Sequence, residues 1–186
     1  MGGGTTLVEA KLLGRNSIGV DINPESIKRC QEKTDFDYPE SGGVSIRLGD
    51  AQKLSFIEDE TIDFICTHPP YANIIQYSDG LDNDLSLLDM KVFLEKMHFV
   101  ACESLRVLKS GKFCAILVGD MRKKGSVIPL GFSVMDVFQE SGFKLKEIIL
   151  KEQHNCKATG YWKTNSIKYN FLLLAHEYLF VFKKDT

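Results

Sequence analysis

Short apolar runs alternate along this chain with stretches of helical hydrophobic spacing, and no other feature constrains the fold as strongly. The apolar runs have the length of buried strands and lie at 17–22, 44–48, 61–67, 112–118, 143–150 and, as a final strand or hairpin arm, 171–182. The helical stretches lie at 5–13, 24–33, 90–108 and 128–141. Such alternation predicts an α/β fold in which helices flank a mostly parallel sheet.

Length and composition favour one domain over residues 1–186. No apolar run approaches the roughly 20 residues that span a bilayer, and the N-terminus lacks the basic and apolar segments of a secretory signal. We therefore expect a cytoplasmic protein that does not contact the membrane. The five cysteines include no Cys-x-x-Cys pair, so we expect no metal site.

Glycines and two aspartates form a candidate cofactor site. Gly2 to Gly4 precede a helix that begins near Thr5, whose N–H groups can meet a bound carboxylate. Asp21 ends an apolar run and can accept the hydroxyl hydrogens of a ribose, and Asp50 ends the next run and can accept from an adenine amino group. The pattern predicts an adenosine-containing ligand, contacted by Gly2, Gly4, Thr5, Asp21, Asp50 and Ala51.

Each of these features also has an ordinary structural explanation. A glycine run is often only a turn, and Asp21 could cap the helix that begins at Pro24. Asp50, which also follows an apolar run, could likewise be only a helix cap. Even taken together, the residues do not distinguish NAD from S-adenosylmethionine.

The segment Thr61 to Asn73, TIDFICTHPPYAN, makes that distinction. An apolar strand here ends in two prolines and a tyrosine at the sheet edge where ligands bind in open α/β folds. The Pro69 carbonyl and a side-chain acceptor at His68 could accept hydrogen bonds from the two hydrogens of an exocyclic amino group. These bonds would localise the nitrogen lone pair for attack on a methyl group. Tyr71 offers a ring face for a flipped base. Alternatively, Pro-Pro-Tyr merely stiffens a loop.

The opening glycines raise a question about the sheet. In a nucleoside site such glycines normally follow a strand that lies centrally, here between the runs at 17–22 and 61–67. Without it, both neighbours would have unpaired edges. We expect an upstream segment or a second chain to supply this first strand. The alternative is that the glycines are a disordered start and the sheet begins later.

The cofactor segment GGGTTLVEAKLLGRNSIGVDINPE and the segment THPPYAN resemble the two main motifs of amino-group DNA methyltransferases, the N4-cytosine and N6-adenine class. The resemblance implies a Rossmann-like methyltransferase fold with an antiparallel final strand and a missing first motif. It also implies S-adenosylmethionine as cofactor and double-stranded DNA, with the target base flipped, as partner. Thr67, His68, Pro69, Pro70 and Tyr71 would be the catalytic residues, without a metal.

Position 68 departs from that family. A Ser or Thr before the two prolines is usual in N4-cytosine enzymes, and Asp or Asn in N6-adenine enzymes, whereas this chain has His68. A neutral imidazole accepts through one nitrogen only, and Thr67 could take over the role. The surrounding residues lean towards cytosine N4.

Candidate nucleic-acid contacts lie outside these motifs, at Lys123, Lys124, Lys157, Trp162 and Lys163. For the aromatic pair Tyr161–Trp162, packing under a loop is an equal alternative to stacking on bases. The stretches 72–87 and 153–169 are expected to be loops. His176 and Glu177 are too isolated for a zinc site and are interpreted as structural.

Three functions stay open. The first is a DNA amino-methyltransferase, within a restriction-modification system or as an orphan modification enzyme. The second keeps the chemistry and changes the acceptor to an RNA base or a protein amide. The third is an inactive or partner-dependent cofactor-binding fragment. The net charge of −2 argues mildly against strong unaided DNA binding.

Overall fold

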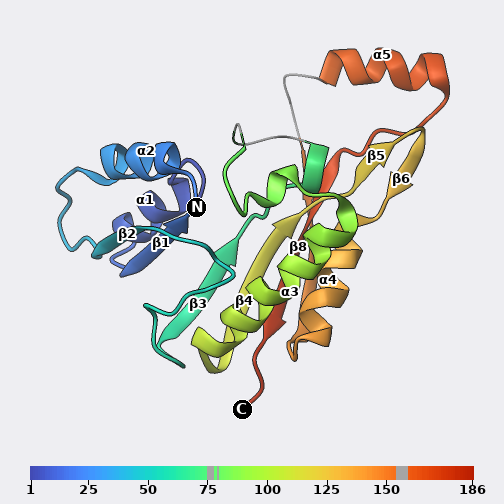
Figure 1. Ribbon diagram of the computed structural model, residues 1–186. Helices are drawn as coiled ribbons and strands as arrows, with labels where there is room; N and C mark the ends of the chain where they lie inside the picture. Colours follow the sequence, from blue (N-terminus) through green and yellow to red (C-terminus); the bar gives the residue numbers. More distant parts are fainter. Residues whose placement is uncertain (75–77, 79, 154–158) are drawn as a thin grey trace.

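The computed structural model describes residues 1–74, 78, 80–153 and 159–186 of the chain. The helices are α1 (Thr5–Leu12), α2 (Pro24–Thr34), α3 (Met90–Val107), α4 (Leu130–Glu140) and α5 (Thr159–Tyr169), with short 3-10 turns at Ala72–Ile74 and Leu85–Leu87. The strands are β1 (Ser17–Asp21), β2 (Val44–Leu48), β3 (Ile62–Thr67), β4 (Leu108–Val118), β5 (Met121–Lys123), β6 (Ser126–Ile128), β7 (Lys144–Glu152) and β8 (His176–Lys183). Figure 1 shows their arrangement. The α/β class predicted from the sequence is confirmed.

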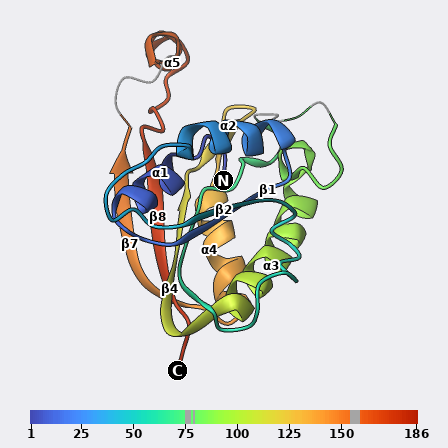
Figure 2. The ribbon, with the colours of Figure 1, turned by 90° about the vertical axis from the view of Figure 1, so that its left-hand side faces the viewer.

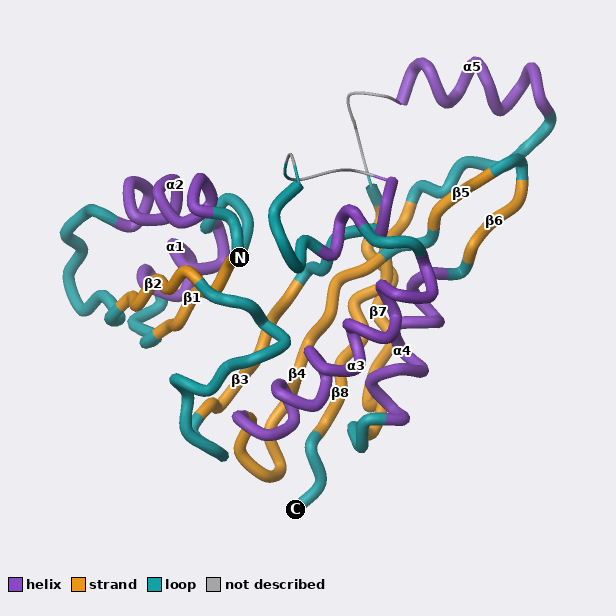
Figure 3. Tube along the Cα trace, viewed as in Figure 1, coloured by secondary structure: helices purple, strands orange, loops and turns teal. Residues whose placement is uncertain are grey.

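The described strands form separate sheets, with a break where the expected first strand would lie. β1 pairs with β2 in parallel, and a second sheet has the order β3-β4-β8-β7. β3 and β4 are parallel, whereas β8 is antiparallel to both β4 and β7. Among the described residues, the free edges of β1 and β3 have no partner strand, so the sheet is interrupted between them (Figure 3).

The N-terminal region consists of α1, α2 and the β1–β2 pair (Figure 2). The Asn23 side chain accepts from the Glu25 N–H and Pro24 occupies the first turn, which starts α2 as the sequence predicts. Only two side chains in α2 and one in α1 are buried. The region therefore has little apolar core of its own.

The main core lies between the four-stranded sheet and the helices α3 and α4, which cover one face of it (Figure 1). Phe138, Phe180 and Phe182 are fully buried there, and the rings of Phe138 and Phe182 stack at 5.4 Å between centroids. Burying each such side chain is worth about 1.5–3 kcal/mol. On the opposite face Phe64 and Ile149 are 57% and 47% exposed, so that face is largely uncovered.

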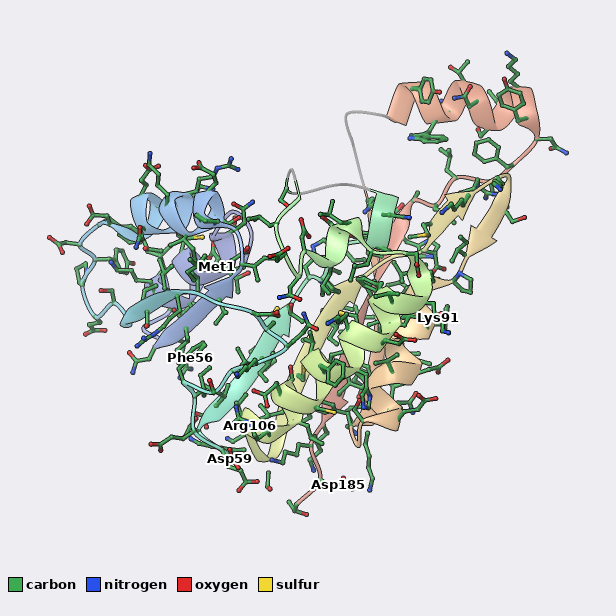
Figure 4. All side chains as sticks on the ribbon, viewed as in Figure 1. Met1, Phe56, Asp59, Lys91, Arg106 and Asp185 are labelled. Carbon is green, nitrogen blue, oxygen red and sulfur yellow. The ribbon has the colours of Figure 1, made fainter. Side chains whose placement is uncertain are left out.

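Hydrogen bonds from Arg106 join the N-terminal region to the four-stranded sheet and its helices, and we call this set of contacts the clasp. Arg106 in α3 donates to the backbone carbonyls of Leu54 and Ile57 and to the Asp59 carboxylate, which holds the segment between β2 and β3 against α3. Figure 4 shows Arg106 and Asp59 together at this end of the molecule. Beside the clasp, Val20 of β1 packs with a small apolar cluster of Leu54, Ile57 and Val107.

A projecting arm consists of β5, β6 and α5 (Figure 1). The prediction of a loop over 153–169 is wrong for its second half, because residues 159–169 form α5, and β8 begins at His176 rather than at 171. The helix has no apolar stripe for a periodicity argument to detect. In the chain as described, no helix is long and apolar enough to cross a bilayer.

Candidate cofactor and catalytic site

The glycine turn requires glycine at two of its three positions. Gly2 and Gly4 have φ values of +56° and +79°, which side chains other than glycine rarely adopt. A Cβ added to Gly4 would lie 2.7 Å from the Cys30 sulfur of α2. Lys33 of the same helix donates to the Gly3 carbonyl at 2.8 Å. Helix α2 therefore supports the turn from behind and fixes its shape.

The structure brings Asp21 to this turn. The Asp21 Oδ2 atom accepts from the Gly2 N–H at 2.9 Å and lies 3.2 Å from the amino group of Met1. Its Oδ1 atom accepts from the Asn23 N–H at 3.0 Å. Since Asn23, not Asp21, caps α2, the capping alternative for Asp21 does not account for its position.

Asp50 lies at the same end of the β1–β2 pair. The Gly49 N–H donates to the Asp21 carbonyl at 2.9 Å, which places Asp50 directly beside the end of β1. Its Oδ1 atom accepts from the backbone and side-chain N–H groups of Gln52, and Oδ2 also accepts from that side chain. Asp50 thus serves its local turn as well. Thr5 and Ala51 are exposed next to these groups.

These residues fit an adenosine-containing cofactor. Two carboxylates end neighbouring parallel strands, and a glycine turn with positive φ values contacts one of them. Carboxylates can accept hydrogens from ribose hydroxyls and from an adenine amino group, and the turn lets backbone approach a ligand closely.

The Pro-Pro-Tyr segment lies at the end of β3. Thr67 is the last residue of that strand and pairs with Ile116 of β4. Pro69 is buried, Pro70 is half-buried, and the His68 side chain is 48% exposed. The position after a strand is therefore occupied by a rigid backbone and an accessible imidazole.

Tyr71 is anchored by residues that are distant in sequence. Its hydroxyl donates to the Glu177 Oε1 atom at 2.7 Å and accepts from the Gly119 N–H at 3.1 Å. Glu177 Oε2 forms an ion pair with Lys151 at 2.6 Å. The sequence interpretation of Glu177 as merely structural missed its contact with Tyr71, because nothing in the chain pattern links positions 71 and 177.

Burial and nearby groups shift the pKa values of Glu177 and His68. Burial alone raises the pKa of Glu177, but hydrogen bonds from Lys151, Tyr71 and Gln153 outweigh it, so the net pKa lies below its usual value. The pKa of His68 is lowered, mainly by burial, although Glu177 opposes this. At neutral pH we therefore take Glu177 as ionised and His68 as neutral.

The N-terminal residue lies at the glycine turn, where the Met1 amino group is 3.2 Å from the Asp21 Oδ2 atom. Figure 4 shows Met1 on the side of the N-terminal region that is turned towards β3. Two broad hollows on the described surface lie elsewhere, one beside Lys11 and Ile46 and one beside Leu150 and His176, and neither is lined by a predicted site residue.

The candidate nucleic-acid residues lie on the projecting arm, away from β1 and β2 (Figure 1). Lys123 and Lys124 are at the β5–β6 turn, and Trp162 and Lys163 are exposed on α5. Tyr161 and Trp162 are edge to face at 5.3 Å and are exposed instead of buried under a loop. Lys157 lies outside the described residues.

The comparisons with known proteins agree on one chemistry. Residues 1–70 match the family described as a methyltransferase domain. Over 174 residues the chain is 24% identical to the Type II beta methyltransferase M.BslI of Bacillus sp. (strain NEB-606), covering 87% of this chain and 18% of that protein. The chain therefore spans less than a fifth of that relative.

Two solved structures share the fold. An S-adenosylmethionine-dependent methyltransferase from Methanosarcina mazei has a TM-score of 0.66 and 14% identity, covering 99% of this chain and 89% of that chain. A candidate DNA modification methylase from Thermus thermophilus, solved with S-adenosylmethionine, has a TM-score of 0.55 and 23% identity, covering 74% and 54%. The chain thus has the fold of S-adenosylmethionine-dependent methyltransferases, its residues 1–70 match the methyltransferase domain, and S-adenosylmethionine is the cofactor these findings support.

Proposed function

We propose that this chain is one catalytic domain that transfers a methyl group from S-adenosylmethionine to an exocyclic amino nitrogen of a DNA base, with cytosine N4 favoured over adenine N6. The observation that carries the proposal is the place of the two motifs at the ends of parallel-paired strands. The glycine turn bonds to Asp21 at the end of β1, and the Pro-Pro-Tyr segment follows the end of β3. The similarity to a Type II beta methyltransferase favours DNA as the acceptor.

The cofactor would be held by the N-terminal region. Gly2, Gly4 and Thr5 would meet its methionine end, Asp21 the ribose hydroxyls, and Asp50 and Ala51 the adenine. When bound, S-adenosylmethionine supplies an electrophilic methyl group on a positively charged sulfur, so the protein needs no covalent intermediate.

The acceptor amine would be held at the end of β3. The Pro69 carbonyl and a side-chain acceptor, His68 or Thr67, would accept hydrogen bonds from its two N–H groups. The nitrogen lone pair would then be available to the methyl carbon. Pro70 stiffens the segment, and the Tyr71 ring, fixed through its hydroxyl, stacks on the base. Transfer of the methyl group would break its bond to the sulfur, leaving a neutral thioether, and would leave the nitrogen with one proton too many, which the accessible His68 side chain would pass to water. Much of the rate would come from this positioning.

The projecting arm would contact DNA. Within 121–128 and 159–173 there are five basic residues and no acidic residue, although the whole chain has a net charge of −2. The basic residues are Arg122, Lys123, Lys124, Lys163 and Lys168. Exposed Trp162 and Tyr161 offer stacking surfaces beside them. Lys157 belongs to the same proposal by its position in the sequence.

We also propose that one extended apolar segment, from the same or a second chain, pairs with β1 and β3 and completes the sheet. Both strands have a free edge among the described residues, and free edges are templates for pairing. Phe64 on β3 and Ile18 on β1 are 57% and 44% exposed, so an inserted apolar strand would cover them. Amide hydrogen exchange with each candidate segment present should slow at 17–21 and 62–67; unchanged exchange there would contradict the pairing.

A transfer assay tests the function. Labelled S-adenosylmethionine is incubated separately with duplex DNA, tRNA and protein, with and without the completing segment. Label in DNA at cytosine N4 is expected. Label in RNA or protein instead would show that the acceptor is not DNA. No label in any acceptor under either condition would favour a cofactor-binding fragment without activity. His68→Ser and His68→Asp then test whether the imidazole limits the rate.

A further inference from the structure

Glu177 is a buried carboxylate to which the proposed chemistry assigns no role. It lies on β8, is 4% exposed, and has both oxygens bonded to side chains from other strands or loops. Oε2 is paired with Lys151, its neighbour across the β7–β8 ladder. Oε1 faces the Pro-Pro-Tyr segment, so the carboxylate connects the main sheet directly to the site.

The hydrogens in this cluster can be assigned from its chemistry. An ionised carboxylate has no hydrogen to donate, so the single hydroxyl hydrogen of Tyr71 must point at Glu177, 2.7 Å away. The Gly119 N–H donates to the same hydroxyl oxygen at 3.1 Å. Towards any third neighbour, the Tyr71 oxygen can therefore act only as an acceptor.

His68 is that third neighbour. Its Nε2 atom lies 3.4 Å from the Tyr71 hydroxyl oxygen and 3.6 Å from Glu177 Oε1. Both oxygens offer lone pairs, so an unprotonated Nε2 would be repelled by them, whereas an N–H there would be attracted to both. In a neutral imidazole one nitrogen carries the hydrogen and the other accepts.

We infer that Glu177, acting through Tyr71, holds neutral His68 with its hydrogen on Nε2 and so leaves Nδ1 as the acceptor for the amine of the substrate. The inference rests on the proposed function for the identity of that amine. Glu177 is then a positioning residue, because it acts through Tyr71 and His68. It supplies what a histidine at position 68 needs, since an oxygen of a carboxylate or hydroxyl always has lone pairs to accept with, whereas an imidazole accepts only at the nitrogen that carries no hydrogen.

The charges around His68 agree with a neutral ring. The pKa of His68 is lowered first by burial, and the positive charge of Lys151 lowers it further. The negative charge of Glu177 raises it, but Lys151 is paired with that carboxylate. Protonation of His68 at low pH would make both nitrogens donors and remove the acceptor.

Nitrogen NMR of the histidine rings tests the inference without any assay of activity. The full chain is labelled at its histidines, and the His68 signals are identified from a His68→Asn spectrum. We expect Nε2 protonated and Nδ1 unprotonated at pH 8 in the wild type. Glu177→Gln, whose amide can also donate, should give a mixture of the two tautomers, whereas Glu147→Gln, an exposed glutamate on β7, should not.

Two NMR results would overturn the inference: wild-type His68 protonated at Nδ1, or an unchanged tautomer in a folded Glu177→Gln protein. Unfolding curves establish that the variants are folded. In the transfer assay, Glu177→Gln should lower kcat about tenfold or more with little change in KM for S-adenosylmethionine, and an unchanged kcat would also contradict the inference. If the wild type methylates nothing while the tautomer is as expected, the proposed function fails, but the placement of the His68 hydrogen on Nε2 stands.

Discussion

The N-terminal region and the four-stranded sheet differ in how each holds its functional residues. The cofactor residues lie on a two-stranded pair with two helices and few buried side chains. The Pro-Pro-Tyr segment lies on a sheet whose one face is covered by α3 and α4 and whose aromatic core is fully buried. An isolated two-stranded unit is marginal in water, whereas a larger packed sheet is not.

The two halves of the site are therefore stabilised by different means. Tyr71 is fixed by bonds to β8 and to the end of β4, within the stable sheet. The glycine turn is fixed locally by α2 and depends on the clasp at Arg106 for its attachment to the sheet. We therefore expect cofactor binding to be more sensitive than the fold to changes in the N-terminal region.

The largest effect, on the free energy of unfolding, should come from a change in the core of the four-stranded sheet. Phe180→Ala removes a fully buried ring and should cost about 3–5 kcal/mol of unfolding free energy. Leu7→Ala, a buried position in α1, should instead loosen the N-terminal region and leave the midpoint of the main urea transition nearly unchanged. Equal shifts of that midpoint by the two variants would show that the regions unfold as one.

The next effect should come from the glycine turn. Gly4→Ala forces a side chain into a left-handed backbone and against Cys30, at a cost of about 3 kcal/mol. Because the strain acts on the turn, affinity for S-adenosylmethionine in calorimetry should fall at least tenfold, or about 1.4 kcal/mol. Gly3→Ala is the matched control, since its Cβ would meet only the end of Lys33 at 3.5 Å. Similar losses in both variants would argue against a shape-specific turn.

A smaller effect should come from the clasp. Arg106→Ala removes the donors to Leu54, Ile57 and Asp59 and should cost about 1–2 kcal/mol, given the partial exposure of the guanidinium. Amide exchange in residues 17–21 and 44–60 should rise more than exchange in β4 and β8. Uniform acceleration across all strands would contradict the separate attachment of the N-terminal region.

The projecting arm should affect DNA binding without affecting either region. Neutralising Lys123 and Lys124 to Gln should lower the slope of log affinity against log salt by roughly 0.9 for each DNA phosphate that the variant no longer neutralises. Stability should not change, since both side chains are exposed. Lys28→Gln on α2 serves as the control for a simple change in net charge. If that variant lowers the slope equally, the arm is not the DNA surface.

The smallest effect should be a pH dependence of the clasp. The hydrogen bond from Arg106 lowers the pKa of Glu103 below its usual value. A carboxylate of this kind contributes stability above the usual pKa of about 4.3 and loses it as pH falls through its lower folded value. The protection factor of the Leu54 amide, whose N–H donates to Glu103, should therefore fall in acid. The fall should disappear in Glu103→Gln; its persistence there would exclude Glu103 as the cause.

The sequence predicted the elements better than their assembly. Strand–helix alternation located β1 to β4 and α1 to α4 within a few residues, because local patterns of burial and capping decide those elements. It did not predict α5, which has no apolar stripe, or the short β5–β6 hairpin. The cofactor and Pro-Pro-Tyr motifs were visible as residues at strand ends. The role of Glu177 was not, because its contact with Tyr71 spans 106 residues and appears only in the folded sheet.

The proposed methyl transfer requires that the cofactor turn and the Pro-Pro-Tyr segment border one site. Amide hydrogen exchange with and without saturating S-adenosylmethionine measures this directly. We predict added protection at residues 2–8, 20–23 and 49–52 and at 67–72, with none on α5. Protection confined to other surfaces, or protection of the glycine turn with no change at 67–72, would contradict a shared site.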